Sequence, residues 1–427
     1  MNKIFAREPI FDLSKQLFAY QFYYRNLKGV FPVDLKELSL HGEPEQVLSI
    51  DDLLHVNLTI VNVMPKDVEN FAAWFSPDDV IVEISDMALQ TTSENIAHLT
   101  HLKSQGFKIV LNYEDIDDVQ MFKSTDFVKV DTLVVTPADI EKLKRQTIAY
   151  DIKLIATQVH NRFQFEQCEK LGVDLVQGFF FLEREDNENK KSIPSSKMSY
   201  MQLMSEISKP ELNIDSLQKI FETDPALSFL LFKFINNPMV NKSYKISSIR
   251  HALNYLGELM VKRFVAIISM AGLNSDKPNE LLNLSLSRAK FCELLNADTD
   301  SKNDAMSAFL VGLFSLIDVI LEKDIAELLS SLKLDDKIIK ALANKEGEFW
   351  DLLGAAKAIE AANWKRIIEM SKELGLSQAS MFENYRRAVK WQNEMTEAVS
   401  HMYPVTRPTP VSKKPTQSRQ RSTGQTQ

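Results

Sequence analysis

Two parts of the chain differ in the spacing of their apolar residues. Up to residue 181, short runs rich in β-branched and aromatic residues alternate with helix-like stretches. The runs are residues 18–24, 80–84, 108–111, 127–130, 153–156 and 175–181. The later runs recur at roughly the 20–30 residues of one βα unit. They are almost wholly apolar, which is typical of strands covered on both faces. The pattern predicts a (β/α) barrel or an open doubly wound sheet.

From residue 198 to about residue 402, apolar residues recur at helical spacing instead. The first two helices are indicated by Leu217, Ile220, Phe221, Leu227, Leu230, Leu231 and Phe234. Asp215 and Ser216 suit the cap of the first helix. Asp224 and Pro225 suit the opening of the second. We therefore expect an all-α domain over residues 198–403.

Two polar segments divide and end this arrangement. Residues 183–197 are charged, carry Pro and Ser and contain one apolar residue, which predicts a linker with solvated charges. Residues 404–427 have no apolar periodicity and carry five basic and no acidic residues, which predicts a disordered basic tail. The barrel would then occupy residues 1–182.

The composition, net charge and cysteine count exclude several classes of protein. The 427 residues are 44% hydrophobic and 25% charged, as in soluble folded proteins. A net charge of −8 is too mild to argue for or against partners, and no basic patch predicts nucleic-acid binding. Two cysteines cannot build a disulfide framework or a cysteine-based metal site. No signal peptide and no membrane-spanning run is visible, so we expect a cytoplasmic protein without a membrane partner.

Candidate functional residues lie where the predicted strands end, because a (β/α) barrel places its chemistry at the carboxyl ends of its strands. The polar residues near those ends are Gln21, Arg25, Asn57, Glu83, Asp86, Asn112, Tyr113, Glu114, Lys129, Asp131, Thr157, His160 and Gln177.

Short motifs around these positions resemble those of EAL domains, bacterial cyclic di-GMP phosphodiesterases with a TIM-barrel fold. The motifs are FAREPIFD, FAYQFYYR, VNLT, VEISD, KIVLNYED, FVKVD, IATQVHN and LGVDLVQGFFF. In the second half, DPALSFLLFKFINNP, ISSIRHALNYLG and AFLVGLFSLIDVIL resemble segments of HDOD domains. The resemblance covers nearly all of residues 3–395. It implies a TIM-like barrel of EAL type followed by an all-α HDOD domain, as in bacterial signalling proteins that fuse the two.

The resemblance implies a changed catalytic site. Active EAL enzymes hold two divalent metals, Mg²⁺ or Mn²⁺, with carboxylates and an Asn. Here the first metal-binding Glu is replaced by Gln21. The paired Asp residues fall on Asn112 and Tyr113. Two further Glu positions fall on Thr157 and His160.

Other positions of the family pattern are retained. They are Asn57, Glu83, the catalytic lysine position at Lys129, Gln177, and Arg25 at a substrate-contacting position. A two-metal site needs several anionic oxygens to offset four positive charges. Gln and Asn supply no charge, and only Glu83 remains of the ligand carboxylates. We therefore expect no hydrolysis and no metal cofactor. Two alternatives stay open: a metal-free cyclic di-GMP receptor using Arg25, Lys129 and Gln177, and a residual phosphodiesterase.

The sequence of the helical half also lacks the histidines of a metal site. Ser315 and Leu316 stand where a related HD phosphohydrolase would carry His-Asp, and His251 is the only histidine between residues 198 and 400. We expect this half to bind protein partners of a signalling pathway, with the oligomeric state left open. The candidate contact residues are Asn236, Asn237, Tyr244 and Arg250; alternatively, they cap helices and shape turns.

Overall fold

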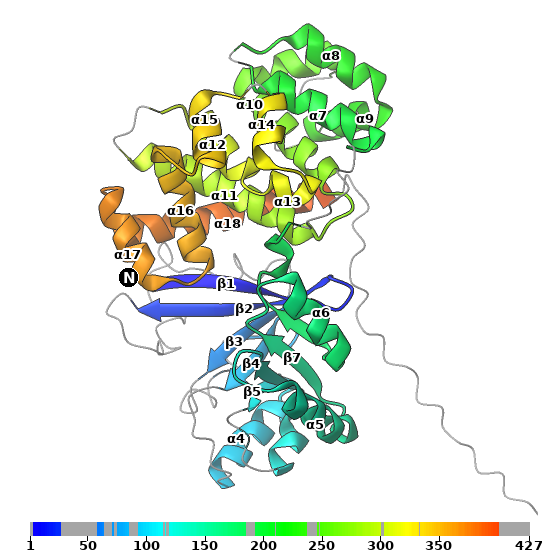
Figure 1. Cartoon of the computed structure of the whole chain (residues 1–427), viewed down its shortest axis with the longest axis vertical. Helices are drawn as coiled ribbons and strands as arrows, with labels where there is room; N and C mark the ends of the chain where they lie inside the picture. Colours follow the sequence, from blue (N-terminus) through cyan, green and yellow to red (C-terminus); the bar gives the residue numbers. More distant parts are fainter. Residues whose placement is uncertain are drawn as a thin grey trace, which may run out of the picture.

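We describe the chain from a computed structural model (Figure 1). The described residues are 3–26, 58–63, 71, 75–84, 93–113, 116, 119–184, 193–209, 211–236, 246, 248–299, 303–332 and 334–400.

The first half is a closed barrel in which the strands follow one another in chain order, β1 to β8. The strands are β1 Lys3–Asp12, β2 Leu17–Asn26, β3 Thr59–Val63, β4 Val80–Ile84, β5 Lys108–Asn112, β6 Phe127–Asp131, β7 Lys153–Thr157 and β8 Leu175–Gln177. The described helices around it are α4 Ser93–Ser104, α5 Pro137–Thr147 and α6 Arg162–Leu171, with the 3₁₀ turns η3 Val119–Ser124, η4 Ile148–Tyr150 and η5 Phe180–Leu182. The expected barrel is confirmed, and the open sheet is excluded.

One strand departs from the expected TIM-like pattern. β1 runs antiparallel to both of its neighbours, β2 and β8, whereas the other pairs are parallel. The cause is the short turn between β1 and β2, where Lys15 adopts a positive φ of 59°. Such a turn joins antiparallel strands, because a parallel connection needs a crossover of about a dozen residues or more.

Each strand contributes one side chain to an apolar layer inside the barrel. The layer consists of Ile10, Ala19, Ile60, Ile81, Val110, Phe127, Ile155 and Leu175. Six of the eight are fully buried, and Phe127 and Leu175 are 4% exposed. The outer faces of the strands pack against the helices in a second apolar cluster. This apolar layer fills the interior of the barrel. Polar residues of the same inner faces lie next to it.

The second half is entirely helical over its described residues. Its helices are α7 Ser195–Ile207, α8 Ile214–Thr223, α9 Pro225–Ile235, α10 Ile249–Leu273, α11 Asn279–Asp298, α12 Ala305–Phe314, α13 Ile317–Leu321, α14 Ile325–Leu332, α15 Asp336–Ala343, α16 Glu348–Glu360, α17 Trp364–Glu373 and α18 Gln378–Ser400. Figure 1 shows this half stacked on the barrel, with β1 and β2 between them, and α16 and α18 contact β1.

Several predicted details change in the structure. The strand expected over residues 175–181 ends at Gln177, because Gly178 takes a φ of 141° and the chain then turns into η5. The cap of α8 is Asn213 rather than Asp215 or Ser216, since its side chain accepts the backbone N–H of Ser216. The predicted opening at Asp224 and Pro225 is confirmed, with the Asp224 side chain accepting two backbone N–H groups of α9.

The predicted linker carries one buried charge. Its last three residues begin α7, and Lys197 is 7% exposed. The Lys197 ammonium donates to Asp276 at 2.5 Å. The expectation that all charges of this segment are solvated is therefore wrong for Lys197. Residues 185–192 of the linker and the predicted tail lie outside the described residues.

Helices α11 and α12 approach each other closely at Gly312. A Cβ there would lie 2.4 Å from the backbone carbonyl atoms of Arg288. Gly312→Ala is expected to force the two helices apart and to destabilise the helical half by about 1–3 kcal/mol. Calorimetry of the full chain should show a melting temperature lowered by several degrees.

The matched control is Gly354→Ala on α16, where a Cβ would meet nothing closer than 3.7 Å from a Met370 side-chain atom. Alanine favours the helix there by up to ~1 kcal/mol. Equal melting temperatures for the two variants would contradict the close approach at Gly312.

Candidate functional site

A polar layer lies directly above the apolar layer inside the barrel. Alternate residues of a strand face the same side, so the residue two positions along each strand shares its inner face. These residues are Glu8, Gln21, Asn62, Glu83, Asn112, Lys129, Thr157 and Gln177. Each of the eight strands therefore supplies one polar side chain to this end of the barrel.

Three residues of this layer form a closed set of hydrogen bonds. The Lys129 ammonium donates to Glu83 Oε2 at 2.9 Å and to Gln21 Oε1 at 2.5 Å. The Gln21 amide nitrogen donates to Glu83 Oε2 at 2.7 Å. The three residues are 2–6% exposed. The retained lysine and glutamate positions are thus paired with each other, and Gln21 bridges them.

A second set lies around the carboxylate of Glu8. Glu8 Oε2 accepts the Tyr23 hydroxyl at 2.9 Å and the Gln177 amide at 2.7 Å. Gln177 Oε1 is buried and accepts no hydrogen bond from any described residue. Burial, followed by the charge of Glu8, raises the pKa of Tyr23 well above its usual range. Tyr23 therefore stays a neutral hydrogen-bond donor at physiological pH.

The other candidates of the barrel are placed as follows. Thr157 Oγ1 donates to the Val130 carbonyl, and Asp131 Oδ1 accepts the backbone N–H of Leu133. Tyr113 packs against the large apolar cluster. The exposed His160 ring pairs with the Gln158 amide.

Some candidates cannot be placed. Arg25 lies on β2 opposite Ile4, but its side chain is outside the described part. Asn57, Asp86 and Glu114 are also outside it.

Two residues of the polar layer, Glu8 and Asn62, and one residue bonded to it, Tyr23, were not predicted from the sequence. Asn62 lies on β3 with its Cα paired to that of Glu83. A signal for Asn62 was present, because the β-branched run around it, TIVNV, repeats the Val-Asn pair that precedes it at residues 56–57. Asn62 has at least one further interaction within the structure.

A buried ion pair occupies the middle of the helical half. Arg288 Nε and Nη2 donate to both carboxylate oxygens of Glu360 at 2.6–3.1 Å. Arg288 Nη1 donates to the hydroxyl of Ser315 at 3.2 Å. Ser315 is the residue that the sequence placed at the His-Asp position of HD enzymes. The ion pair of Arg288 and Glu360 therefore lies next to Ser315.

Among the described residues, no group of three or more His, Cys, Asp or Glu side chains could hold a metal ion. No helix described in the structure combines the length and the hydropathy that crossing a lipid bilayer requires. Both cysteines, Cys168 and Cys292, are buried free thiols.

Comparison with known families assigns the second half. The model of the HDOD domain matches residues 193–348. Residues 193–348 are an HDOD domain. The match begins two residues before α7, and the expected order of a closed barrel followed by an all-α HDOD domain is confirmed.

Two relatives align along almost the whole chain. The uncharacterised protein YuxH of Bacillus subtilis is 29% identical over 413 residues, which cover 93% of this chain and 100% of YuxH. The protein of Vibrio cholerae named cyclic di-GMP phosphodiesterase CdgJ is 27% identical over 405 residues, which cover 92% of this chain and 93% of CdgJ. Among solved structures, the EAL domain of DcpA from Mycobacterium smegmatis matches with a TM-score of 0.34 and 19% identity, over 42% of this chain and 90% of that chain.

The candidate contact residues of the HDOD domain that can be placed have structural roles. Asn236 is the C-cap of α9. Arg250 donates to Gln218 and to Asp215, at the start of α8. Asn237 and Tyr244 lie outside the described residues. For Asn236 and Arg250, the observed contacts support the alternative that these residues cap helices and shape turns.

The helical half contains, near the ion pair of Arg288 and Glu360, a lysine with a displaced pKa, Lys357 on α16. The Lys357 ammonium lies 4.6 Å from the centre of the Trp350 ring. Burial, and secondly the charge of Arg288, lower the pKa of Lys357 to about 8. The unfolded chain therefore binds more protons than the folded chain between about pH 8 and pH 10.5. The free energy of unfolding therefore rises with pH across that window. Below about pH 8 it is lowered by the full cost of burying the charged Lys357 ammonium.

Lys357→Met is accordingly expected to raise the melting temperature at pH 7, and to raise it less at pH 10. Lys372→Met, at an exposed position of α17, is the control and should leave the melting temperature near that of the unmodified protein at both pH values. A stabilisation by Lys357→Met that is the same at pH 7 and pH 10 would show that protonation of this lysine is not its cause. Calorimetry of the full chain at the two pH values measures both.

Proposed function

We propose that this chain is a non-enzymatic signalling protein of cyclic di-GMP systems, and that it acts through protein partners bound by its HDOD domain. The observation that carries the proposal is the closed set formed by Lys129, Glu83 and Gln21. A lysine that neutralises the nearest carboxylate leaves neither group available for a metal or a phosphate without breaking a buried ion pair.

The donor set supports the absence of a metal cofactor. At the end of the barrel that carries the polar layer, the inner faces of the described strands carry the carboxylates of Glu8, Glu83 and Asp131. Each is already engaged, by Tyr23 and Gln177, by Lys129, and by a backbone N–H, respectively. Two divalent ions need several anionic oxygens converging on them. These residues do not fit such a pair, and we derive no reaction step through a metal.

A metal-free receptor finds little support in the same contacts. A nucleotide phosphate would need the Lys129 ammonium, which Glu83 and Gln21 hold, and the Gln177 amide, which Glu8 and Tyr23 hold. A residual phosphodiesterase is favoured by one observation, the name of the Vibrio relative. These two functions are the alternative outcomes of the binding experiment below.

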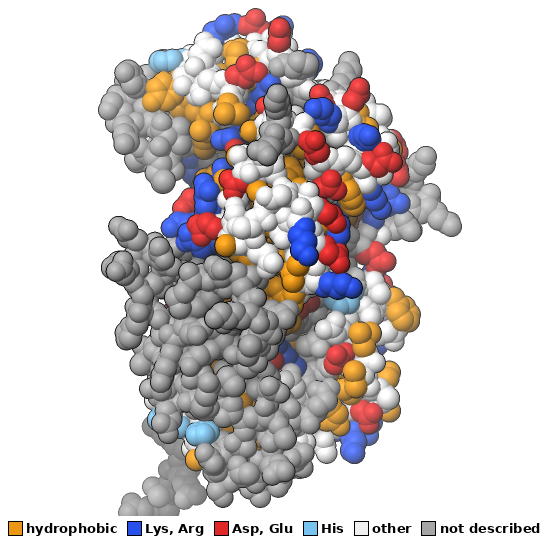
Figure 2. Space-filling view, turned by 90° about the vertical axis from the view of Figure 1, so that its left-hand side faces the viewer, with side chains coloured by type: hydrophobic (Ala, Val, Ile, Leu, Met, Phe, Trp, Pro, Cys, Tyr) orange, Lys and Arg blue, Asp and Glu red, His pale blue; other side chains and the backbone are white. Residues whose placement is uncertain are grey.

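The surface of the HDOD domain supports protein recognition. Phe229 on α9 is 61% exposed, and Tyr255, Leu259 and Met260 on the adjacent α10 are 38–51% exposed. Figure 2 shows hydrophobic side chains on the described surface of this half. Large apolar side chains that are exposed on two contacting helices are candidates for a protein contact site.

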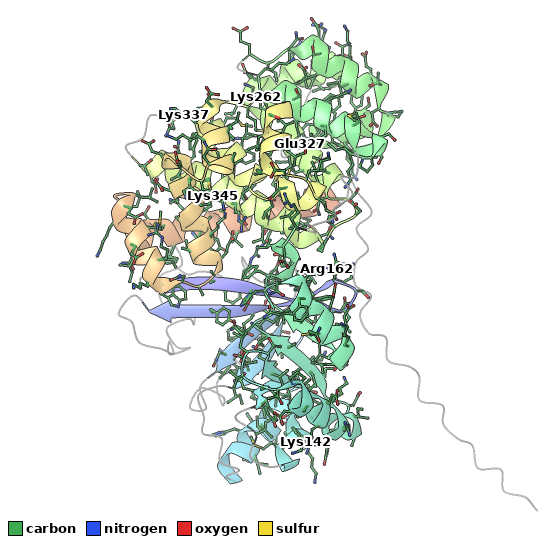
Figure 3. All side chains as sticks on the ribbon, viewed as in Figure 1. Lys142, Arg162, Lys262, Glu327, Lys337 and Lys345 are labelled. Carbon is green, nitrogen blue, oxygen red and sulfur yellow. The ribbon has the colours of Figure 1, made fainter. Side chains whose placement is uncertain are left out.

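The cations of the HDOD domain support a partner other than nucleic acid. Figure 3 shows Lys262, Lys337 and Lys345 well apart from one another. Lys262 pairs with Glu258, and Lys337 donates to Asn303. These three described lysines, two of which have described partners, do not form a basic stripe of the kind that binds a phosphate backbone.

Isothermal titration of cyclic di-GMP into the full chain, with and without Mn²⁺, separates the candidates. The proposal predicts no heat of binding in either condition. Binding without metal would instead establish a receptor. Binding only with Mn²⁺ would point to the enzyme.

Co-purification of the full chain with its partners from the source organism tests whether the HDOD domain binds proteins. Phe229→Asp with Leu259→Asp is expected to abolish partner recovery. Phe163→Asp, on the barrel helix α6 and 69% exposed, is the matched control and should leave recovery unchanged. Loss of partners only with the α6 variant would assign recognition to the barrel.

A further inference from the structure

The ribbon formed by β1 and β2 faces two different sites. On β1, the adjacent residues Arg7 and Glu8 point to opposite sides, since successive side chains of a strand alternate. Glu8 lies in the polar layer of the barrel, whereas Arg7 donates to Gln392 on α18 at 2.6 Å. On β2, Gln21 faces the polar layer in the same way. The Tyr20 hydroxyl donates to Glu280 on α11 at 2.6 Å.

The contact between the ribbon and the HDOD helices is buried and polar. Arg7, Tyr20, Glu280 and Gln392 are each between 2% and 7% exposed. The guanidinium of Arg7 also lies 4.6 Å from the centre of the Tyr20 ring. Burial and the charge of Glu280 raise the pKa of Tyr20 well above its usual range, so its hydroxyl keeps its proton and its bond to Glu280. A buried polar contact of this kind tolerates little displacement, because an unmatched donor or charge is costly in a low dielectric.

Further hydrogen bonds join α11 and α18 to each other next to this contact. Asn283 Nδ2 on α11 donates to Glu280 at 3.0 Å, and its Oδ1 accepts the Gln392 amide at 3.1 Å. Thr396 on α18 donates to the same Asn283 oxygen at 2.8 Å. A shift of Tyr20 or Arg7 therefore reaches α11 and α18 together.

The same region continues toward the ion pair at Ser315. Burial raises the pKa of Tyr385 on α18, the charge of Arg7 opposes the rise, and Glu360 and Glu280 add to it. Tyr385 thus lies within electrostatic reach of both the ribbon and the ion pair. Glu360 in turn holds Arg288, which donates to Ser315. Buried polar and charged groups therefore extend from the outer face of the ribbon to the ion pair of the helical half.

We propose that the β1–β2 ribbon couples the polar layer of the barrel to the arrangement of α11 and α18. Glu8 and Gln21 are Cα partners across the ribbon, so a change at either inner side chain moves both strands. Their chain neighbours Arg7 and Tyr20 must follow, because the peptide between adjacent residues is planar and stiff. A ligand or substitution that rearranges the inner face is thereby transmitted to the HDOD helices, and a change at those helices is transmitted back.

The test is amide hydrogen exchange on the full chain, without nucleotide, so its outcome is independent of the function proposed above. Gln21→Met removes the bridge to Glu83 and Lys129 but touches no HDOD residue. The inference predicts several-fold faster exchange around Glu280 in α11 and around Gln392 in α18. Conversely, Glu280→Gln should speed exchange around Gln21.

Thr157→Val is the matched control, on the inner face of β7, which pairs with β6 and β8 and not with β1 or β2. It should leave exchange in α11 and α18 unchanged. Should Gln21→Met fail to fold, Tyr23→Phe on the same inner face takes its place. Unchanged exchange in α11 and α18 after the ribbon substitution would overturn the inference. So would an equal increase after Thr157→Val, because it would mean general loosening.

Discussion

Arg288→Met is expected to destabilise the HDOD domain by about 3–5 kcal/mol, the usual effect of removing one partner of a buried ion pair. The side chains of Arg288 and Glu360 are 3% and 6% exposed, and three short hydrogen bonds join them. Without the guanidinium, the Glu360 carboxylate remains buried next to apolar helices. Chemical denaturation of the full chain, followed by the helical signal, measures the change.

The double variant Arg288→Met with Glu360→Met distinguishes ion pairing from packing. Two apolar residues of similar volume leave no unpaired charge, so most of the lost stability should return. The exposed pair of Arg145 and Glu141 gives the control, and Arg145→Met should cost less than about 1 kcal/mol. A double variant as unstable as the single one would show that Arg288 acts through its packing volume.

Lys129→Met is expected to destabilise the barrel by a similar amount, about 3–5 kcal/mol. The side chains of Lys129 and Glu83 are each 7% exposed. After the substitution, Glu83 keeps one donor, the Gln21 amide, and has no described cation bonded to it. Denaturation followed by exchange of the barrel amides measures the effect.

Lys144→Met is the matched control, since the pair of Lys144 and Asp174 is 24% and 32% exposed and should contribute about 1 kcal/mol or less. Lys129→Met with Glu83→Gln should recover much of the loss. If Lys129→Met is no more harmful than Lys144→Met, the ion pair inside the barrel does not hold as described.

The sequence predicts the strands and helices wherever local pattern decides them. Apolar runs such as VIVEI become barrel strands, and Asp224 with Pro225 opens α9 as expected. The antiparallel β1 was not predicted, because its direction depends on the tight turn at Lys15 and on pairing with β8, which is distant in the chain.

Part of the polar layer was predicted from the sequence, but its arrangement was not. Glu83, Lys129 and Gln177 were singled out, and all three lie in the polar layer. The pairing of Lys129 with Glu83 through Gln21 joins strands 46 to 108 residues apart in sequence, which no local pattern records. The contact of Arg7 with Gln392 spans 385 residues and was missed for the same reason.

We expect the barrel not to hydrolyse cyclic di-GMP, because Lys129, Glu83 and Gln21 satisfy one another and the described residues offer no two-metal donor set. The most direct measurement incubates the full chain with cyclic di-GMP and Mn²⁺ and separates the linear product by chromatography. We predict no linear product beyond that formed without protein, for the unmodified chain and for Glu83→Gln alike. Sustained turnover by the unmodified chain that disappears in Glu83→Gln would contradict the claim.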